Sequence, residues 1–481
     1  MKEGTKKKME RKGTFGTSIL MLFIVIVVLA VGIIGCGFEA HVPITISCGL
    51  LMIYGLYYLK IEWTELRDSI VNSASASLEC MIIILLIGCT VGTWVSSGTV
   101  PMIIVWGLKI FSPKFFLVSI LIICALMSMV TGSSWTTMGT VGVAFMGVGY
   151  GLGINPAITA GAIVCGAYFG DKQSPLSDTT NFAAAVAKTD LYKHVRSMLY
   201  TTGPALGVTA VIFTILGLNI SGEGDTSAVT ELVTGLESVF HFHVILILPL
   251  ILMIVLIAVK FPAVPTLLLC SIVGAIMTIV FQGATLKEAG TYWYSGYVGT
   301  SGIETIDKLL TRGGLSSMYY TVALMIVSLM MAGLMERCGI IEALMNKLQN
   351  LTKTRVGLII TQLIAGYCLS YIAADPYLTM LLPANAFGEK YDELGLDRSV
   401  LSRTLEDSGT LVAPMVPWGS NGVYAATALG VSTMSYLPYY FMGFINPIFA
   451  ILCAVTGFGM IKAAKQEKTV DTKETAQAVE G

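Results

Sequence analysis

The chain has 481 residues, of which 55% are hydrophobic and only 12% carry a charge. So few charges cannot cover the surface of a water-soluble protein of this length, so the composition predicts a polytopic membrane protein. The formal net charge is -1, and no basic stripe with interleaved aromatic residues indicates a nucleic-acid partner.

The chain begins with a basic segment, residues 1–16, which precedes a long apolar run. That run is longer than the hydrophobic region of a usual signal peptide and further apolar runs follow it, so we expect an uncleaved first helix. The positive-inside rule places the basic segment in the cytoplasm. The polar tail at residues 462–481 is expected to be disordered and also cytoplasmic.

Apolar runs close to the ~20 residues that cross a bilayer recur along the chain. With both termini in the cytoplasm the number of crossings is even, and ten spans plus two re-entrant hairpins satisfy this condition. The predicted spans are residues 17–37, 41–59, 78–97, 156–187, 198–220, 242–259, 262–282, 316–335, 402–429 and 436–460. The predicted hairpins are residues 115–149 and 356–387, and polar clusters interrupt the spans at 156–187 and 402–429.

These elements divide the chain into scaffold and transport core. We expect scaffold helices at residues 17–59 and 198–301, a first core repeat at 60–197, a second at 302–435 and a last helix at 436–461. The linker that opens the first repeat is predicted to be an interfacial helix on the cytoplasmic face.

The two core segments share a local pattern. A Thr-Met pair that begins at Thr137 is followed fifteen residues after its Met by Gly153, and a Thr-Met pair at Thr379 is followed at the same distance by Gly395. A polar cluster comes next in both. The linkers that flank the second hairpin carry seven cations and those of the first carry two, so equivalent linkers are expected on opposite sides. This predicts two inverted-topology repeats, each with a re-entrant hairpin and a broken helix.

Both breaks are rich in the oxygen ligands that a small hard cation such as sodium requires. Ionisable groups at membrane depth are costly and usually mark an ion or substrate path. The candidates at the first break are Ser133, Ser134, Thr136, Thr137, Asp171, Lys172, Ser174, Ser177, Asp178, Thr179 and Asn181. Those at the second break are Asp375, Asp407, Ser408, Thr410, Ser420 and Asn421. Among them the expected sodium ligands are Asp178, Asn181, Asp407 and Asn421.

Hydroxyls in membrane helices often bond only their own backbone, so the carboxylates carry most of this prediction. Lys172 could simply neutralise Asp171 beside it. No neighbouring cation is evident in the sequence for Asp178, Asp375 or Asp407, which favours a ligand or proton-carrier role.

A carboxylate in a low-dielectric site without a permanent cation can exchange a proton for sodium. Competition between the two ions at one site is the simplest antiport mechanism. The role of Glu406, beside Asp407, is left open, whereas Glu39 and Glu79 lie near predicted helix ends and are expected to be interfacial.

The strings GDKQSPLSDTTN at residues 170–181 and TGSSWTTMGTVG at residues 131–142 resemble the NhaC family of sodium/proton antiporters, within the ion transporter superfamily. The similarity covers residues 18–462. The resemblance implies an all-α elevator-type transporter, a homodimer in the cell membrane, that moves sodium and protons without a cofactor.

The family also includes sodium-coupled malate/lactate exchangers. A sodium- or proton-coupled exchanger of a small organic acid or amino acid therefore stays open as an alternative, with Lys172 and Trp418 as candidate substrate contacts. No zinc-binding H-E-x-x-H, phosphate loop or G-x-S-x-G motif is present, so an enzyme is not expected.

Overall fold

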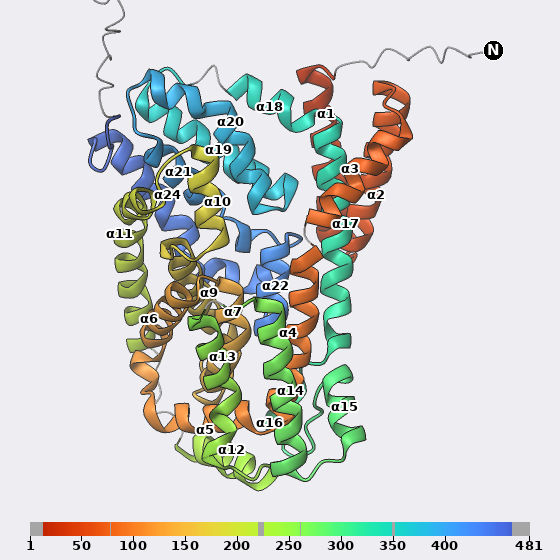
Figure 1. Ribbon diagram of the computed structural model, residues 1–481, viewed down its shortest axis with the longest axis vertical. Coiled ribbons are helices and arrows are strands. Elements are labelled where there is room, and N and C mark those ends of the chain that lie inside the picture. The colour runs from red at the N-terminus through yellow and green to blue at the C-terminus, as the bar shows by residue number, and fades with distance from the viewer. Residues whose placement is uncertain (1–12, 77, 220–225, 260, 349–351, 464–481) are drawn as a thin grey trace, which may run out of the picture.

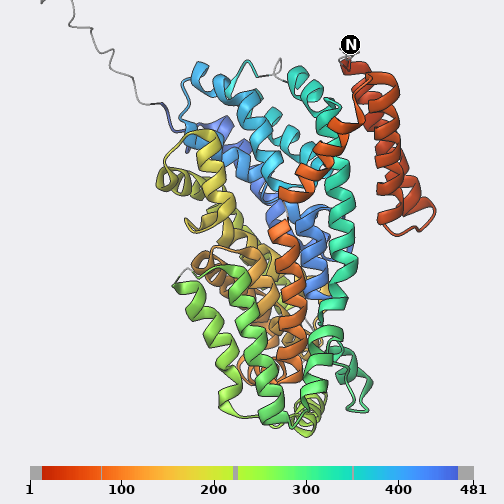
Figure 2. The same cartoon turned by 45° about the vertical axis from the view of Figure 1, so that its right-hand side comes forward.

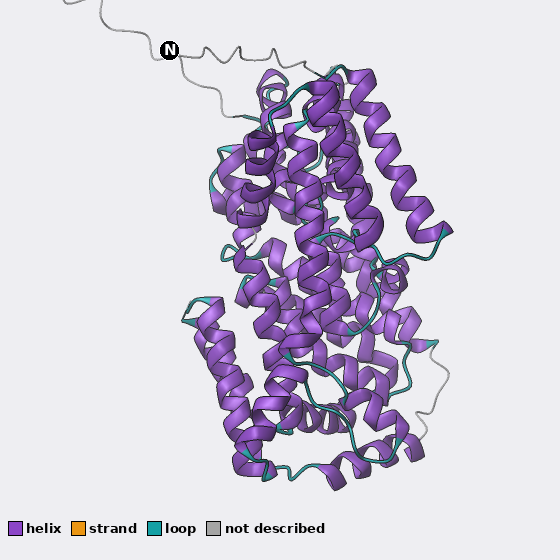
Figure 3. Ribbon diagram, turned by 90° about the vertical axis from the view of Figure 1, so that its right-hand side faces the viewer, coloured by secondary structure: helices purple, strands orange, loops and turns teal. Residues whose placement is uncertain are grey.

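The computed structural model describes residues 13–76, 78–219, 226–259, 261–348 and 352–463. All the regular elements in this part of the chain are helices, and the β-pairing within it is limited to two isolated bridges (Figure 3). The prediction of an all-α protein is confirmed. Most of the predicted basic N-terminus (1–16) and tail (462–481) lies outside the described residues.

Helices that could cross a bilayer are spread over the described chain. Seven are long and apolar enough on their own, and up to ten qualify if each of three bent pairs is one span. The chain is therefore a multi-pass membrane protein. The ten are not the ten predicted spans, because they include Pro113–Thr131 and Arg355–Ala373, which the sequence assigned to hairpins.

The first part of the chain builds an outlying pair of helices and then a tightly packed group. The pair, α1 and α2, lies along one side of the molecule (Figure 2). The helices are α1 (Phe15–Ala30), α2 (His41–Ile53), α3 (Trp63–Ala76), α4 (Leu78–Ser96), α5 (Thr99–Ile110), α6 (Pro113–Thr131), α7 (Ser134–Thr137), α8 (Val143–Gly151), α9 (Pro156–Gln173), α10 (Asp178–Ala187) and α11 (Leu191–Leu218). Short π-helical turns η1 (Val31–Gly35), η2 (Tyr54–Leu59) and η3 (Met138–Gly142) extend α1, α2 and α7.

The second part contains the short 3-10 helices η4 (Val244–Ile247), η5 (Leu315–Met318), η7 (Ala413–Met415) and η8 (Leu437–Tyr439). Its α-helices are α12 (Thr226–Val239), α13 (Leu248–Ala258), α14 (Ala263–Gln282), α15 (Leu286–Ser295), α16 (Glu304–Leu310), α17 (Tyr319–Arg337), α18 (Ile340–Leu348), α19 (Arg355–Ala373), α20 (Pro376–Glu393), α21 (Arg398–Ser408), α22 (Ser420–Leu429), α23 (Thr433–Tyr436) and α24 (Phe441–Thr456). The sequence did not predict α5, α12, α15 or α16, which are short or too polar to read as spans. They lie toward the lower end of the molecule in Figure 1.

Two sharp turns join helices where the sequence placed hairpin tips. Gly132 ends α6 with φ of 69°, and Ala374 ends α19 with φ of 54°. Glycine adopts this left-handed conformation without strain, whereas alanine is strained there. The next residues, Ser133 and Asp375, cap the following helices by accepting hydrogen bonds from first-turn N–H groups.

The two broken helices pass each other in opposite directions. The pieces α9 and α22 lie lower in Figure 1, and α10 and α21 lie higher. The first break separates Gln173 at the end of α9 from the cap Ser177, and the second separates Ser408 from Gly419. The chain thus places two helix C-terminal ends, of α9 and α21, in the interior.

Close packing of α6 against α9 holds the first of these ends in place. A Cβ atom added at Gly170 would lie 2.1 Å from the Ala125 carbonyl oxygen, so only glycine allows the two backbones to approach this closely. In the second half, Gly366 of α19 makes a similar approach to Ser408 of α21.

Candidate ion-binding site

A fully buried ion pair joins the two breaks. The ammonium of Lys172, near the end of α9, donates to Oδ1 of Asp407, near the end of α21, and both side chains are 0% exposed. The same oxygen accepts from the Thr201 hydroxyl at 3.1 Å and the Asn446 amide at 2.8 Å. The interpretation that no cation lies near Asp407 is therefore wrong, because its partner is 235 residues away. Lys172 also does not serve simply to neutralise Asp171.

Asp171 is instead bound by the first hairpin tip. Its Oδ2 accepts from the Ser134 backbone N–H at 3.0 Å and from the Ser134 hydroxyl at 2.6 Å. Its Oδ1 meets no hydrogen-bond partner among the residues that the structure describes. The hydroxyls of Ser133 and Thr137 bond locally, since Ser133 caps α7 by accepting from the Thr136 backbone N–H and Thr137 donates to the Ser133 carbonyl.

Glu406 completes a cluster of buried charges. It is 0% exposed, and within the described part of the chain neither of its carboxylate oxygens has a hydrogen-bond partner. It interacts electrostatically with Lys172, Asp171 and Asp407, and the Thr410 side chain approaches it without closing a hydrogen bond. We call Asp171, Lys172, Glu406 and Asp407 the buried acidic cluster. It sets three carboxylates against one ammonium, an arrangement that is costly unless further cations balance it.

A second contact joins the first hairpin tip to the second broken helix. The Trp135 indole N–H donates to Oδ1 of Asn421 at 2.7 Å, and the Tyr168 hydroxyl donates to the same oxygen at 2.8 Å. Tyr424 stacks on Trp135 with ring centroids 4.4 Å apart. An amide oxygen has two lone pairs, so a sodium ion at Asn421 would have to replace one of these donors.

The other two predicted sodium ligands lie on an exposed part of α10. Asp178 is exposed, and its Oδ2 accepts from the Tyr377 hydroxyl of the second hairpin tip at 2.5 Å. Asn181 is also exposed, and its amide donates to the carbonyl oxygens of Pro175 and Ser177 at 2.9 and 2.7 Å. These two residues are thus accessible from outside the protein interior, unlike Asp407.

Most of the remaining predicted hydroxyls bond within their own segment. The Ser408 hydroxyl donates to the Thr404 carbonyl at 2.8 Å, and the hydroxyls of Ser177 and Thr179 meet at 3.0 Å. Ser174 accepts from the Leu176 N–H, Ser420 accepts from the Asn421 amide, and Thr410 lies 3.9 Å from the Met380 sulfur.

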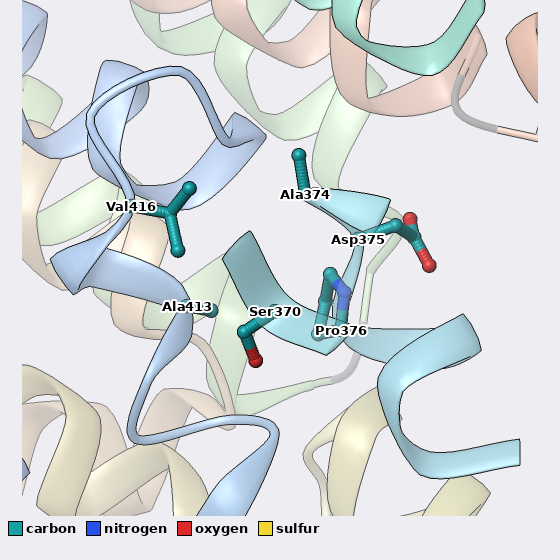
Figure 4. Close-up of a pocket in the computed structure, with 6 residues that line it drawn as sticks. All are labelled: Ser370, Ala374, Asp375, Pro376, Ala413 and Val416. Atoms are coloured by element: carbon teal, nitrogen blue, oxygen red, sulfur yellow. The ribbon is translucent and has the colours of Figure 1, made fainter. Parts of the chain in front are cut away.

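The carboxylate of Asp375 does not point toward the second break. It accepts from the Leu378 N–H at 2.9 Å and so caps α20. Figure 4 shows its carboxylate pointing away from Ser370 and Val416, with which it lines a small pocket. The expected meeting of Asp375 with Asp407 is not among the contacts of the described residues.

Several residues of the site escaped sequence reasoning: Trp135, Tyr168, Thr201, Tyr377 and Asn446. Asn446 carried a usable signal, because it is an amide within the otherwise apolar last span. The other four residues carried no such signal, because a Trp, Tyr or Thr in a membrane helix is usually interpreted as a packing residue.

Helices interrupted by polar clusters, with charged side chains buried where the breaks meet, define a polytopic membrane transport protein. A family model described as the Na+/H+ antiporter family matches residues 166–458. The NhaC Na+/H+ antiporter of Alkalihalophilus pseudofirmus is 37% identical over 455 residues, which are 94% of this chain and 98% of the relative. This chain belongs to the Na+/H+ antiporter family, and the predicted resemblance to NhaC proteins is confirmed.

Relatives that are named for other substrates are similarly close. The malate-2H+/Na+-lactate antiporter of Bacillus subtilis is 38% identical over 413 residues, which are 86% of this chain and 88% of the relative. The arginine/ornithine antiporter ArcD of Halobacterium salinarum is 34% identical over 470 residues, 97% of each chain. Identity alone therefore does not rank the substrates.

Proposed function

We propose that this protein is a sodium/proton antiporter, a secondary active transporter that extrudes sodium in exchange for protons by alternating access. The observation that carries the proposal is the buried acidic cluster, which lies where the two broken helices meet. Its surplus of negative charge can be balanced by a sodium ion or by protons, so the two ions compete for one region. Membership of the Na+/H+ antiporter family supports this reading.

The two ends of the candidate region would have different tasks. Asp407, deep in the protein and joined to Lys172, would belong to the ion site itself. Asp178 and Asn181, exposed on α10 beside the second hairpin tip, would meet the ion before it enters. Asn421 would set the position of the first hairpin tip through Trp135.

Two inverted repeats would supply this arrangement. Turns and helix caps in the first half have counterparts in the second half, and the two members of each pair are separated by the same number of residues. The pairs are the turns Gly132 and Ala374, the caps Ser133 and Asp375, the caps Asn155 and Asp397, and the caps Ser177 and Gly419. The aromatic residues that reach the other half, Trp135 and Tyr377, share the same spacing. The opposite directions of the broken helices in Figure 1 support an inverted relation.

We further propose that the protein is a homodimer in the cell membrane with both termini in the cytoplasm, and that the core moves against the scaffold as an elevator. The start of α1 and the end of α24 lie toward the same end of the molecule (Figures 1 and 2), in support of an even number of crossings. Exposed apolar residues such as Leu20 and Phe23 on α1, 58% and 60% exposed, suit a lipid or subunit contact.

Exchange of a small organic acid or amino acid is the second candidate, favoured by the malate/lactate and arginine/ornithine relatives. The two side chains expected to contact such a substrate are already engaged. Lys172 pairs with Asp407, and the Trp418 indole donates to the Tyr371 carbonyl at 2.9 Å. The geometry therefore favours the sodium/proton reading.

Proton flux in proteoliposomes that hold the purified protein tests the choice. Sodium is added alone, and then together with lactate, malate or an amino-acid mixture. Proton movement on sodium alone is the expected result. Movement only when an organic solute is also present would overturn the antiporter and establish the exchanger.

A further inference from the structure

Unpartnered hydrogen-bond acceptors gather at the inner ends of α9 and α21. Among the described residues, the buried acceptor atoms without a partner in this region are Asp171 Oδ1, Gln173 Oε1, Glu406 Oε1 and Oε2, Asp407 Oδ2 and Asn446 Oδ1. Carboxylate and amide oxygens cannot satisfy one another, because none of them donates. Native proteins rarely leave such groups unsatisfied. The buried cation on α21, Arg403, has an unpartnered Nε, but its guanidinium donates to the carbonyl oxygens of Ser197 and Gly459 and not to these acceptors.

The local field also favours a cation. The C-terminal end of a helix carries partial negative charge, and both α9 and α21 end beside the buried acidic cluster. Lys172 supplies one positive charge, and its ammonium donates a hydrogen bond to Asp407 Oδ1. Both oxygens of Glu406 and Asp407 Oδ2 are left in this negative potential without a hydrogen-bond partner in the described chain, and Lys172 is the one cation that acts on Glu406 there.

We infer that the transported cation binds at the end of α21, with Glu406 and Asp407 Oδ2 as carboxylate ligands and Asn446 Oδ1 and the Thr410 hydroxyl as neutral ligands. The inference rests on the proposed function and names the site of its cation. Asn446 is suited to this place because its amide nitrogen already binds Asp407 Oδ1, which holds its oxygen close by.

The ligand set indicates a monovalent cation. In the described residues no group of three or more His, Cys, Asp or Glu could hold a metal ion, so amide and hydroxyl oxygens must complete the site. Lys172 lowers the negative charge that the cluster offers, whereas a calcium site usually presents several free carboxylates. Sodium carries a single positive charge and binds several oxygen ligands, so it fits this set.

Equilibrium binding of radioactive sodium to the purified full-length protein in detergent tests the site. Glu406→Gln removes the charge with little change of shape, and Glu79→Gln, at an exposed position near the start of α4, is the matched control. We expect Glu406→Gln to weaken sodium binding by about tenfold or more, as loss of a buried charged partner does, and Glu79→Gln to bind like wild type. Wild-type affinity in Glu406→Gln overturns the inference but leaves the antiporter standing. A wild-type protein that binds no sodium would count against the antiporter itself.

Thermal unfolding separates a ligand from a structural residue. If Glu406 is a cation ligand, Glu406→Gln should raise Tm in sodium-free buffer and abolish the rise of Tm that sodium causes in wild type. A lower Tm with the sodium-dependent rise intact would show a structural role. Thr410→Val, which removes one neutral ligand at nearly constant shape, is the second variant. We expect weaker sodium binding in it, and unchanged binding would also overturn the site.

Discussion

One polar string supplies carboxylates to two very different environments. Asp171, from the string at residues 170–181, is 6% exposed and belongs to the buried acidic cluster, whereas Asp178, seven residues on, is exposed and bonded to Tyr377. The sequence ranks Asp178 with Asp407 as a sodium ligand, and the structure separates them. Asp171 is bound by Ser134 of the first hairpin tip inside the buried cluster, whereas Asp178 is bound at the surface by Tyr377 of the other half, so the predicted effects of substitution should differ as well.

The largest effect is expected at the buried ion pair. Asp407→Asn should reduce exchange to background, and because it leaves the Lys172 ammonium buried without a partner it should destabilise the protein by about 3–5 kcal/mol. Proton flux in proteoliposomes and thermal unfolding measure the two effects.

A double variant separates stability from transport at this pair. Lys172→Met with Asp407→Asn removes both charges, so it should recover most of the stability without recovering exchange. Recovered exchange in the double variant would show that Asp407 acts only as the counter-ion of Lys172.

The close approach of α6 and α9 should matter nearly as much. Gly170→Ala forces a methyl group against the Ala125 carbonyl, so we expect a loss of about 1–3 kcal/mol in the free energy of unfolding, typical of overpacking. Gly203→Ala on α11 is the control, since apart from its chain neighbours and the nearby backbone of α11 no described atom lies within 4 Å of its added Cβ. Equal stability of the two variants would mean that the position of the buried cluster does not depend on this packing.

A smaller effect is expected at the exposed carboxylate. Asp178→Asn and Tyr377→Phe each weaken or remove the same hydrogen bond, so both should slow sodium-driven proton flux by a similar factor of about ten or less. If Asp178→Asn instead abolishes flux while Tyr377→Phe is mild, Asp178 binds the ion directly. The division between the buried and exposed regions would then fail.

The smallest effect is expected at the first hairpin tip. Trp135→Phe keeps an aromatic ring to stack on Tyr424 but loses the indole N–H that donates to Asn421. The loss of one neutral hydrogen bond, about 1 kcal/mol, should slow flux a few-fold. A reduction as large as that of Asp407→Asn would place this tip at the centre of the mechanism.

The sequence revealed the local features of this architecture. Apolar runs gave the helices, and glycine, proline and polar residues gave the places where helices stop, such as the turn at Gly132 and the cap at Ser177. These signals are local, because a cap or a left-handed turn is determined by a few neighbouring residues. The helix α5, which follows α4 after a sharp bend, was missed because it is too short to be a span, and α12 was missed because it is both short and more polar.

The partners across the site could not be predicted in the same way. Lys172 stands next to Asp171 in the sequence, yet it pairs with Asp407, and Trp135 reaches Asn421, 286 residues away. Such contacts depend on how the two halves pack, which a single sequence does not reveal. The same reason left Glu406 undecided, since its significance lies in the partners it lacks within the described chain.

The central claim is that sodium and protons compete for the buried acidic cluster. The most direct test is the sodium dependence of proton flux in proteoliposomes at a series of pH values. Lower pH supplies more protons to the carboxylates, so the apparent sodium affinity should weaken steadily as the pH falls, while the maximal flux at saturating sodium changes less. An apparent sodium affinity that does not change with pH would contradict a shared site.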